Sequence, residues 1–360
     1  MPSSDIKLTV ADMALPALAG GGRLRSIGIL LIPGFSLMAY ASAIEPLRAA
    51  NTLSGRMLYR WANVSLDGRP TAASNGAMVN ADLPVGGKSP FETLLVCCGG
   101  DSSLFKHQST LRWLRALARK GLTIGGVSGG SAYILARAGL LDSRRFTVHW
   151  EHLPSLREEF PQLRSSRTLF EFDRDRLTCS GGTAALDMMH ELIAADHGRA
   201  FAASVSDWLL HTDIRPGNRP QRMTMRERFD IGNPKLLAVL EAMEANLETP
   251  LSREGLSRIA GLSTRQLERL FHSHLSSTIG EHYLAVRLDR SQILLRQSPL
   301  PIVQIAIACG FVSTSHFSRT YKQRFTCSPG IERRTAITRY QRGSALRGSG
   351  DDAPKTVGIP

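Results

Sequence analysis

The chain has 360 residues, of which 42% are hydrophobic and 21% charged, enough apolar material for two ordinary domains. No stretch approaches the roughly 18 consecutive apolar residues of a membrane span. Asp5 and Asp12 lie where a secretory signal would be basic. We therefore expect a cytoplasmic protein without a membrane partner.

The formal net charge of +13 is concentrated in one segment. Residues 215–342 carry 20 Lys and Arg against 10 Asp and Glu, whereas the rest of the chain is close to balanced. This concentration is typical of a segment that binds phosphate groups, although a solvated basic face has the same composition.

The five cysteines are scattered along the chain and show no paired CxxC spacing. A zinc site or a redox couple requires such pairs. We therefore expect buried, reduced thiols, no metal site and no cofactor.

Changes in composition divide the chain into five segments. The first residues are small, rich in glycine and aperiodic, and the last residues are similar. Residues 215–222 contain two prolines, a glycine and three arginines, which neither a helix nor a central strand can accommodate. We predict a flexible arm, a larger domain, a basic linker, a smaller domain and a flexible tail over residues 1–24, 25–213, 214–233, 234–334 and 335–360.

The larger domain, residues 25–213, alternates short apolar runs with helical patterns. Strands are predicted at residues 27–32, 94–98 and 122–127, and helices at residues 41–53, 109–120 and 130–138. This alternation indicates a flavodoxin-like α/β domain, in which helices cover both faces of a parallel sheet. Ligands of such sheets bind beyond the carboxyl ends of the strands, so the turns that follow the strands are candidate sites.

The sequence Gly-Val-Ser-Gly-Gly at residues 126–130 resembles a nucleophile elbow, in which a strand turns into a helix and exposes one side chain. With residues 136–150 and 179–187, it resembles the class I glutamine amidotransferase-like, PfpI-type domain over about residues 24–213. Enzymes of that superfamily carry cysteine at the elbow, commonly followed by histidine, whereas this chain has Ser128 and Gly129. A serine hydroxyl needs an adjacent general base, so we expect no catalytic residue and no enzyme.

The PfpI resemblance implies a pocket for a small-molecule inducer, such as arginine, betaine, carnitine or another amino-acid-like or quaternary-ammonium compound. Glu45 matches an acidic residue of the superfamily near the elbow, and a helix-surface glutamate is the alternative. His149 is either a pocket or a packing histidine, and Trp150 and Phe35 either face an ammonium group or belong to the core. The predicted ligand-binding residues are Glu45, Gly100, Asp101, Ser128, Gly129 and His149.

Residues 251–271 predict a helix, a three-residue turn and a second helix. Ser252 caps the first helix, and Ser263 begins the second in a capping box with Gln266. The apolar stripe of the first helix is Leu256, Ile259 and Ala260. In the second helix the inward residues are Leu267, Leu270 and Phe271, and the outward residues are Thr264, Arg265, Glu268 and Arg269.

A second copy of this pattern follows at residues 301–325. Pro301 suits the first helical position, Gly310 ends that helix and Ser313 caps the next. The inward residues of the capped helix are Phe317, Tyr321 and Phe325. Between the copies, residues 278–296 form one helical pattern of roughly 27 Å. A helix of this length sets the two outer helices for successive major grooves, about 34 Å apart.

The two copies resemble the AraC/XylS family of transcription activators over about residues 234–334. The matching motifs include Gly-Leu-Ser-x-Arg-Gln-Leu from residue 261 and Ala-Cys-Gly-Phe-x-Ser-x-Ser-His-Phe-Ser-Arg from residue 308, whereas Ile331-Glu332 departs from the aromatic residue that is frequent in the family. The resemblance implies double-stranded DNA, RNA polymerase and a second copy of the chain as partners. The predicted DNA-binding residues are Thr264, Arg265, Arg269, Thr314, Ser315, His316 and Arg319.

Arginine can present two donors to guanine O6 and N7, but a phosphate contact or an ion pair between helices is the alternative for each arginine. We predict a sequence-specific transcription regulator, an activator, whose dimer shifts toward a DNA-competent arrangement when a metabolite binds. In the alternatives, the sensor domain hydrolyses an amide or acts on a carbonyl compound, or it serves only for dimerisation.

Overall fold

The computed structural model describes residues 24–88, 90–298, 300–335 and 338. The chain divides into two compact units between Gln221 and Arg222. Residues 1–23 of the predicted arm and most of the predicted tail lie outside the described residues. Within these ranges, every helix is too short or too polar to cross a membrane.

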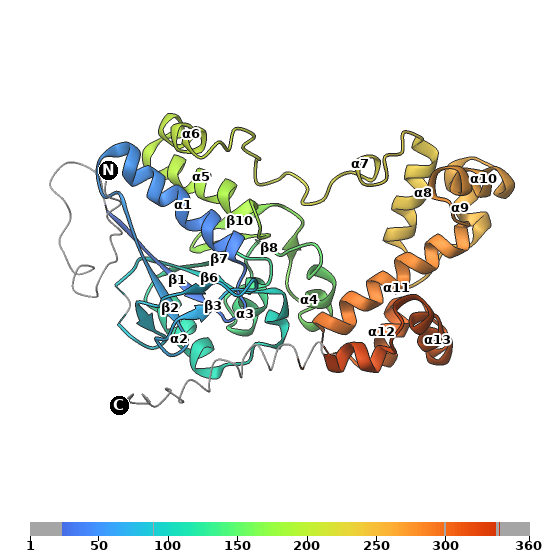
Figure 1. Cartoon of the computed structure of the whole chain (residues 1–360), viewed down its shortest axis with the longest axis horizontal. Helices are drawn as coiled ribbons and strands as arrows, with labels where there is room; N and C mark the ends of the chain where they lie inside the picture. Colours follow the sequence, from blue (N-terminus) through green and yellow to red (C-terminus); the bar gives the residue numbers. More distant parts are fainter. Residues whose placement is uncertain (1–23, 89, 299, 336–337, 339–360) are drawn as a thin grey trace, which may run out of the picture. The chain divides into compact units, whose positions relative to one another are not determined.

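A seven-stranded sheet forms the centre of the first unit (Figure 1). Its strands are β1 (Arg25–Leu31), β2 (Tyr59–Ser65), β5 (Leu83–Pro84), β6 (Thr93–Cys97), β7 (Thr123–Gly126), β10 (Phe170–Asp173) and β11 (Arg176–Cys179). The order is β10-β11-β7-β6-β1-β2-β5, and only the edge pair β10–β11 is antiparallel. The predicted α/β class with a mainly parallel sheet is confirmed.

Helices cover both faces of this sheet. Helices α1 (Leu37–Ser54), α5 (Ala184–His197) and α6 (Arg199–Trp208) pack on one face, and α2 (Gln108–Arg119), α3 (Ser131–Arg137) and α4 (Leu153–Glu159) on the other. The alternation of strand side chains produces two cores. In β1, for example, Leu30 belongs to the core under α2 and α3, whereas Ile29 and Leu31 belong to the core under α1 and α5.

Smaller elements complete the first unit. They are β3 (Thr71–Ala72) paired with β4 (Met78–Val79), β8 (Phe146–Thr147) paired with β9 (Ser165–Ser166), and the 3-10 helix η2 (Gly100–Leu104). Helix α1 begins four residues before its predicted start because Ser36 caps it, its Oγ accepting a hydrogen bond of 3.3 Å from Ala39 N.

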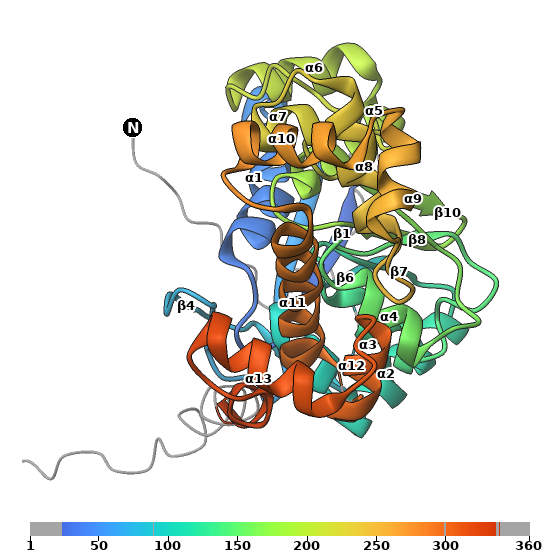
Figure 2. The ribbon, with the colours of Figure 1, turned by 90° about the vertical axis from the view of Figure 1, so that its right-hand side faces the viewer.

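The second unit is helical, as predicted. Its helices are α7 (Met225–Phe229), α8 (Pro234–Ala245), α9 (Arg253–Ala260), α10 (Thr264–Leu275), α11 (Ile279–Gln297), α12 (Ile302–Ala308) and α13 (Thr314–Phe325). Figure 2 shows α11 extending between α8, α9 and α10 at one end and α12 and α13 at the other. The second unit has two small cores of its own. Ile279 and Tyr283 of α11 pack in the core formed with α8, α9 and α10, and Leu288 and Leu294 pack in the core formed with α12 and α13.

Two local predictions in this unit are wrong. Ile259 was predicted to face inward but is 46% exposed. The buried face of α9 instead includes Leu256, Ser257 and Ala260, because the Ser257 hydroxyl donates to Thr264 Oγ1 across the turn at 3.2 Å. Pro301 is the residue before α12 and not its first helical residue.

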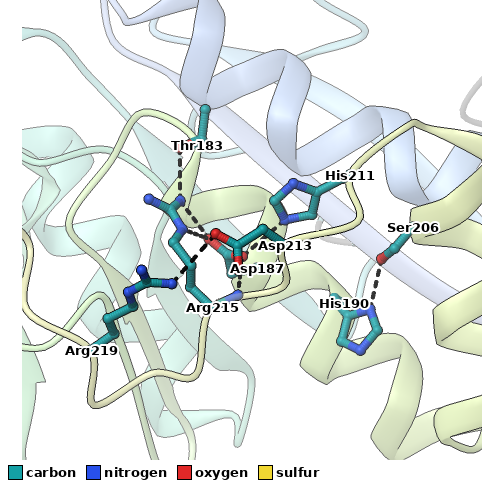
Figure 3. A network of polar contacts seen from close by, with 8 residues as sticks. All are labelled: Thr183, Asp187, His190, Ser206, His211, Asp213, Arg215 and Arg219. Atoms are coloured by element: carbon teal, nitrogen blue, oxygen red, sulfur yellow. Dashed lines mark hydrogen bonds and ion pairs between the residues drawn. The ribbon is translucent and has the colours of Figure 1, made fainter.

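The stretch predicted as a basic linker is divided between the two units. Figure 3 shows Arg215 bound to Asp187 of α5, whose carboxylate is fully buried. The guanidinium donates to this carboxylate from Nε at 2.9 Å and from Nη2 at 2.6 Å, and His211 donates to it at 2.9 Å. Beyond Gln221, Met225 and Ile231 belong to the core of the second unit. Much of the stretch is thus fixed to one unit or the other.

Candidate functional site

Helix α10 begins at a capping box that fixes which residues face outward. Ser263 Oγ accepts from Gln266 N at 3.3 Å, and Gln266 Oε1 accepts from Ser263 N at 2.9 Å. Leu267 and Phe271 are fully buried. The opposite face, which carries Arg265 and Arg269, is therefore exposed.

Helix α13 repeats this arrangement with different side chains. Ser313 Oγ accepts from His316 N at 3.3 Å, and Phe317 and Tyr321 are fully buried. The exposed side chains of the first turns are Thr314, Ser315, His316 and Arg319. The His316 ring lies 5.9 Å from the ring of Phe311, so it rests on the turn between α12 and α13.

The arginines of this unit fall into two groups. Several bind acceptors of the protein itself: Arg287 donates to the Cys309 and Gly310 carbonyls, Arg324 to Asp289, Arg296 to Glu332 and Arg228 to Glu244. In the described part of the chain, by contrast, the side chains of Arg265, Arg269 and Arg319 have neither a hydrogen bond nor an ion pair. The interhelical ion pair, one alternative for these arginines, is thus absent there.

Thr264 differs from the other predicted DNA-binding residues. Its hydroxyl accepts from Ser257 and its side chain is half-buried. Thr264 therefore joins the two helices of the first helix-turn-helix unit.

In the first unit, the turns after the parallel strands meet at one edge of the sheet. A Cβ on Gly99 would lie 2.1 Å from the Gly34 carbonyl oxygen, and one on Gly129 would lie 2.4 Å from His149 Cβ. A Cβ on Gly181 would lie 2.6 Å from Gly129 N. Glycines therefore allow these turns to pack against one another at the predicted ligand edge.

Ser128 does not have the geometry of a nucleophile elbow. Its side chain is 2% exposed, and its Oγ accepts from Cys98 N at 2.8 Å and lies 3.2 Å from Cys98 Sγ. Its φ is also not in the left-handed region. The expectation that this turn exposes one side chain is wrong, because the end of β6 covers the hydroxyl. Burial raises the pKa of the Cys98 thiol to about 11, so this cysteine is a neutral thiol.

His149 is a partly exposed polar residue at this edge. Its side chain is 33% exposed, and its Nδ1 accepts from Glu151 N at 3.3 Å, which leaves the ring proton on Nε2. The ring lies 5.2 Å from the Trp150 ring and 5.7 Å from the His152 ring. Burial, reinforced by His152, lowers the pKa of His149 to about 4, so the imidazole is neutral at pH 7.

The other predicted ligand residues have different surroundings. Glu45 is 44% exposed and accepts from Arg48 Nε at 2.8 Å and from Nη2 at 2.6 Å. The described partner of Glu45 is thus Arg48, on the next turn of α1, and not Ser128. Gly100 and Asp101 begin η2, but their side-chain surroundings lie outside the described residues.

Sequence reasoning missed Gln221, the last residue of the first unit. Its Nε2 donates to Thr147 Oγ1, the Val148 carbonyl and the Thr168 carbonyl at 2.7–3.0 Å, and its Oε1 accepts from Trp150 N at 2.7 Å. The Gln221 side chain therefore holds the end of the first unit against residues 148 and 150, on either side of His149. No local sequence pattern predicts this role, because the residues that Gln221 contacts lie more than 50 positions away in the chain.

Within the described ranges, no three His, Cys, Asp or Glu side chains are grouped to hold a metal ion. The fold and its exposed arginines define the class of protein: an α/β domain joined to a helical domain with two helix-turn-helix units.

Comparisons with known proteins agree with this class. Residues 25–195 match the DJ-1/PfpI family, and residues 256–335 match the helix-turn-helix domain family. The HTH-type transcriptional regulator GlxA of Rhizobium meliloti is 46% identical over 89% of this chain and 99% of its own length. The HTH-type transcriptional regulator CdhR of Pseudomonas aeruginosa is 44% identical over 84% of this chain and 90% of its own.

A crystal structure of an AraC family transcriptional regulator from Pseudomonas putida is 30% identical, covers 51% of this chain and 99% of its own, and superposes with a TM-score of 0.48. The chain belongs to the family of HTH-type transcriptional regulators that combine a DJ-1/PfpI domain with an AraC-type helix-turn-helix domain.

Proposed function

We propose that this regulator reads DNA with Arg265 and Arg269 of α10 and with Arg319 of α13. The observation that carries the proposal is that these guanidinium groups are exposed and lack partners in the described structure, on helices whose opposite faces are buried. A free guanidinium can present its paired donors to guanine O6 and N7. Ser315, His316 and Thr314 flank Arg319 on the same exposed turns and complete the second reading surface.

Arg319→Ala tests this proposal, with Lys322→Ala as the matched control on the same helix. A duplex is first selected from genomic fragments with the full chain. Arg319→Ala should then weaken binding to this duplex by about 1 to 3 kcal/mol and relax the preference at one base position. Lys322→Ala, a substitution at an exposed position, should weaken binding to all duplexes alike. Equal weakening by Arg319→Ala on every sequence would show a phosphate contact instead.

We also propose that an inducer binds at the sheet edge beside His149, Trp150 and Gly129. Trp150 is 36% exposed, and aromatic rings attract ammonium groups. The Glu151 carboxylate lies 3.9 Å from His149 Nδ1 and is 38% exposed, so it can supply the negative charge that we had expected from Glu45. An amino-acid-like or quaternary-ammonium ligand fits this combination. A thermal shift of the full chain with glycine betaine, absent in Trp150→Ala, tests the site.

The Gln221 contacts suggest how this site acts on DNA binding. Trp150 N donates a hydrogen bond to Gln221 Oε1. A ligand that moves Trp150 would therefore alter this hydrogen bond and the position of Gln221, where the connection to the second unit begins. Ligand binding alters DNA affinity only if it favours one arrangement of this connection. Membership of the AraC-type family further supports a homodimer that contacts RNA polymerase as an activator.

The sensor domain acts, in this proposal, without catalysis. Ser128 is buried against Cys98 and has no described contact with His149. The lowered pKa of His149 makes it a weak base, which is a further reason against hydrolysis. Wild type and Ser128→Ala should show the same absence of turnover on a panel of amides, esters and reactive carbonyl compounds. Turnover by wild type that Ser128→Ala abolishes would establish the enzymatic alternative.

A further inference from the structure

The first unit carries a shallow, open hollow rich in arginine at the amino ends of β7 and β11, opposite the proposed inducer edge. The hollow has a volume of about 400 Å³. We call it the arginine pocket and define it by the charged residues among its lining: Arg115, Arg119, Arg144, Asp175 and Arg176. A second hollow, of about 550 Å³, shares Arg144 and adds Arg145 and Arg164.

The charges of the arginine pocket are not balanced. Its lining has four arginines and one carboxylate, Asp175, which Arg144 contacts through Nη2 at 2.7 Å and Arg176 through Nη1 at 2.8 Å. Outside the lining, the Asp173 carboxylate also attracts Arg144. Arg115 and Arg119 of α2 have no ion pair within the described chain. Cations held around one hollow repel one another, and an anion between them would relieve this repulsion.

One buried donor of the pocket also lacks a partner. Arg144 Nη1 is buried and makes no hydrogen bond among the described residues, and the same holds for Asp175 Oδ1, which faces Arg144 Nη2. Arg176 beside it is 5% exposed and is held in place by a 2.9 Å hydrogen bond from Nε to the Leu140 carbonyl. A buried charged donor without an acceptor is costly, and the oxygen of a bound anion would supply that acceptor.

The backbone on both sides of the pocket is bent into an uncommon conformation. Ser143, directly before Arg144, has φ 54°, and Arg174, directly before Asp175, has φ 56°. Residues other than glycine rarely adopt this left-handed region. The two turns therefore hold the Arg144 and Asp175 side chains in position at a conformational cost.

We propose that the arginine pocket binds a phosphate-bearing small molecule, at a second site separate from the inducer edge. Arginine matches phosphate oxygens with two parallel donors, and the pocket volume is within the roughly 300 to 1,000 Å³ of small-molecule sites. Contact with the backbone of DNA needs neither a concave pocket nor a buried arginine. For these reasons the geometry favours a small ligand over a duplex.

Calorimetric titration of the full chain with inorganic pyrophosphate, in a phosphate-free chloride buffer, tests this proposal. The test variant is Arg115→Gln/Arg119→Gln, because neither side chain has a described contact that folding requires. The control variant is Lys106→Gln/Arg112→Gln, which removes the same charge from exposed positions outside the pocket lining. Phosphate binding by the helix-turn-helix unit would be the same in both variants.

We expect saturable binding that the test variant weakens by about tenfold or more and that the control changes by less than about twofold. Absence of binding by wild type, or equal weakening in both variants, would overturn the proposal. The proposal would also be overturned if the arginine pocket binds DNA. In that case the test variant, and not the control, would lose affinity for a duplex, and pyrophosphate would not bind.

Discussion

Arg319 and Arg324 lie on the same helix, yet their surroundings differ. Arg324 binds Asp289 of α11, whereas Arg319 is exposed and has no partner in the described structure. Helix periodicity places Arg319 opposite the apolar face and Arg324 beside that face, but it cannot tell which of them meets a carboxylate of another helix. That distinction depends on tertiary packing, and it separates an arginine that holds the fold from one available to DNA.

The same limit applies to Ser128 and Glu45. The strand, the turn and the helix around Ser128 follow from local pattern, but the burial of its hydroxyl depends on Cys98, 30 residues earlier. For Glu45, resemblance indicated a site near the elbow, whereas its described contact is with Arg48 on the same helix. Site chemistry taken from a motif is therefore less secure than the fold taken from the same motif.

His149 provides a prediction at this scale, on pH dependence. In the folded chain its pKa is lowered to about 4, so between that pH and about 6.5 only the unfolded state binds the proton. The free energy of unfolding should therefore decrease as the pH falls below about 6.5 and level off below about 4. Because a third of the side chain is exposed, we expect a contribution on the order of 1 kcal/mol.

The comparison of wild type with His149→Gln measures this contribution. Thermal unfolding of the two proteins at pH 7.5, 5.5 and 4.5 should show a smaller loss of stability for the variant, whereas His274→Gln, at an exposed histidine of α10, should follow wild type. Parallel curves for wild type and His149→Gln would contradict the assignment of a neutral, partly buried imidazole.

At the scale of elements, hydrophobic periodicity and capping residues were sufficient to locate most helices. The capping box of Ser263 and Gln266, the cap at Ser313 and the buried pair Phe317 and Tyr321 were all visible in the sequence, and the structure confirms them. Ile259 was misassigned because α9 has only eight residues, and two alternative stripes fit so short a helix. A hydrogen bond to the next helix decides between them.

Ser263→Ala tests the importance of a cap for the first reading helix. Loss of the Ser263 side chain leaves Gln266 N without its acceptor, and we expect destabilisation of the second unit by about 1 kcal/mol. Ser273→Ala, an exposed position late in the same helix, is the control and should have a much smaller effect. Urea unfolding, followed by a probe in the second unit, measures both, and equal destabilisation would mean that the cap does not stabilise α10.

At the scale of the whole molecule, the structure divides the chain between Gln221 and Arg222, and no sequence signal indicates how this boundary is attached. The Arg215–Asp187 ion pair and the Gln221 contacts each join residues separated by more than 20 positions, beyond the range of periodicity or turn signals. These contacts fix the end of the first unit, and Met225 begins the core of the second. The connection between them is consequently much shorter than the sequence suggests.

Gln221→Ala tests this attachment. Without the four hydrogen bonds of its side chain, the chain near residues 219–222 should open more often, and trypsin should cleave after Arg222 several times faster. Gln108→Ala, an exposed glutamine at the start of α2, should leave the cleavage rate unchanged. Cleavage of Gln221→Ala at the rate of wild type would show that other contacts hold the boundary.

The central claim is that two helices joined by α11 read adjacent turns of one duplex. Guanine methylation interference on the selected duplex tests it most directly, because it reports contacts at N7 in the major groove. The account predicts two clusters of interfering guanines in each half-site, about 10 base pairs apart, of which Arg269→Ala removes one and Arg319→Ala the other. A single cluster, or a pattern that both variants leave intact, would contradict it.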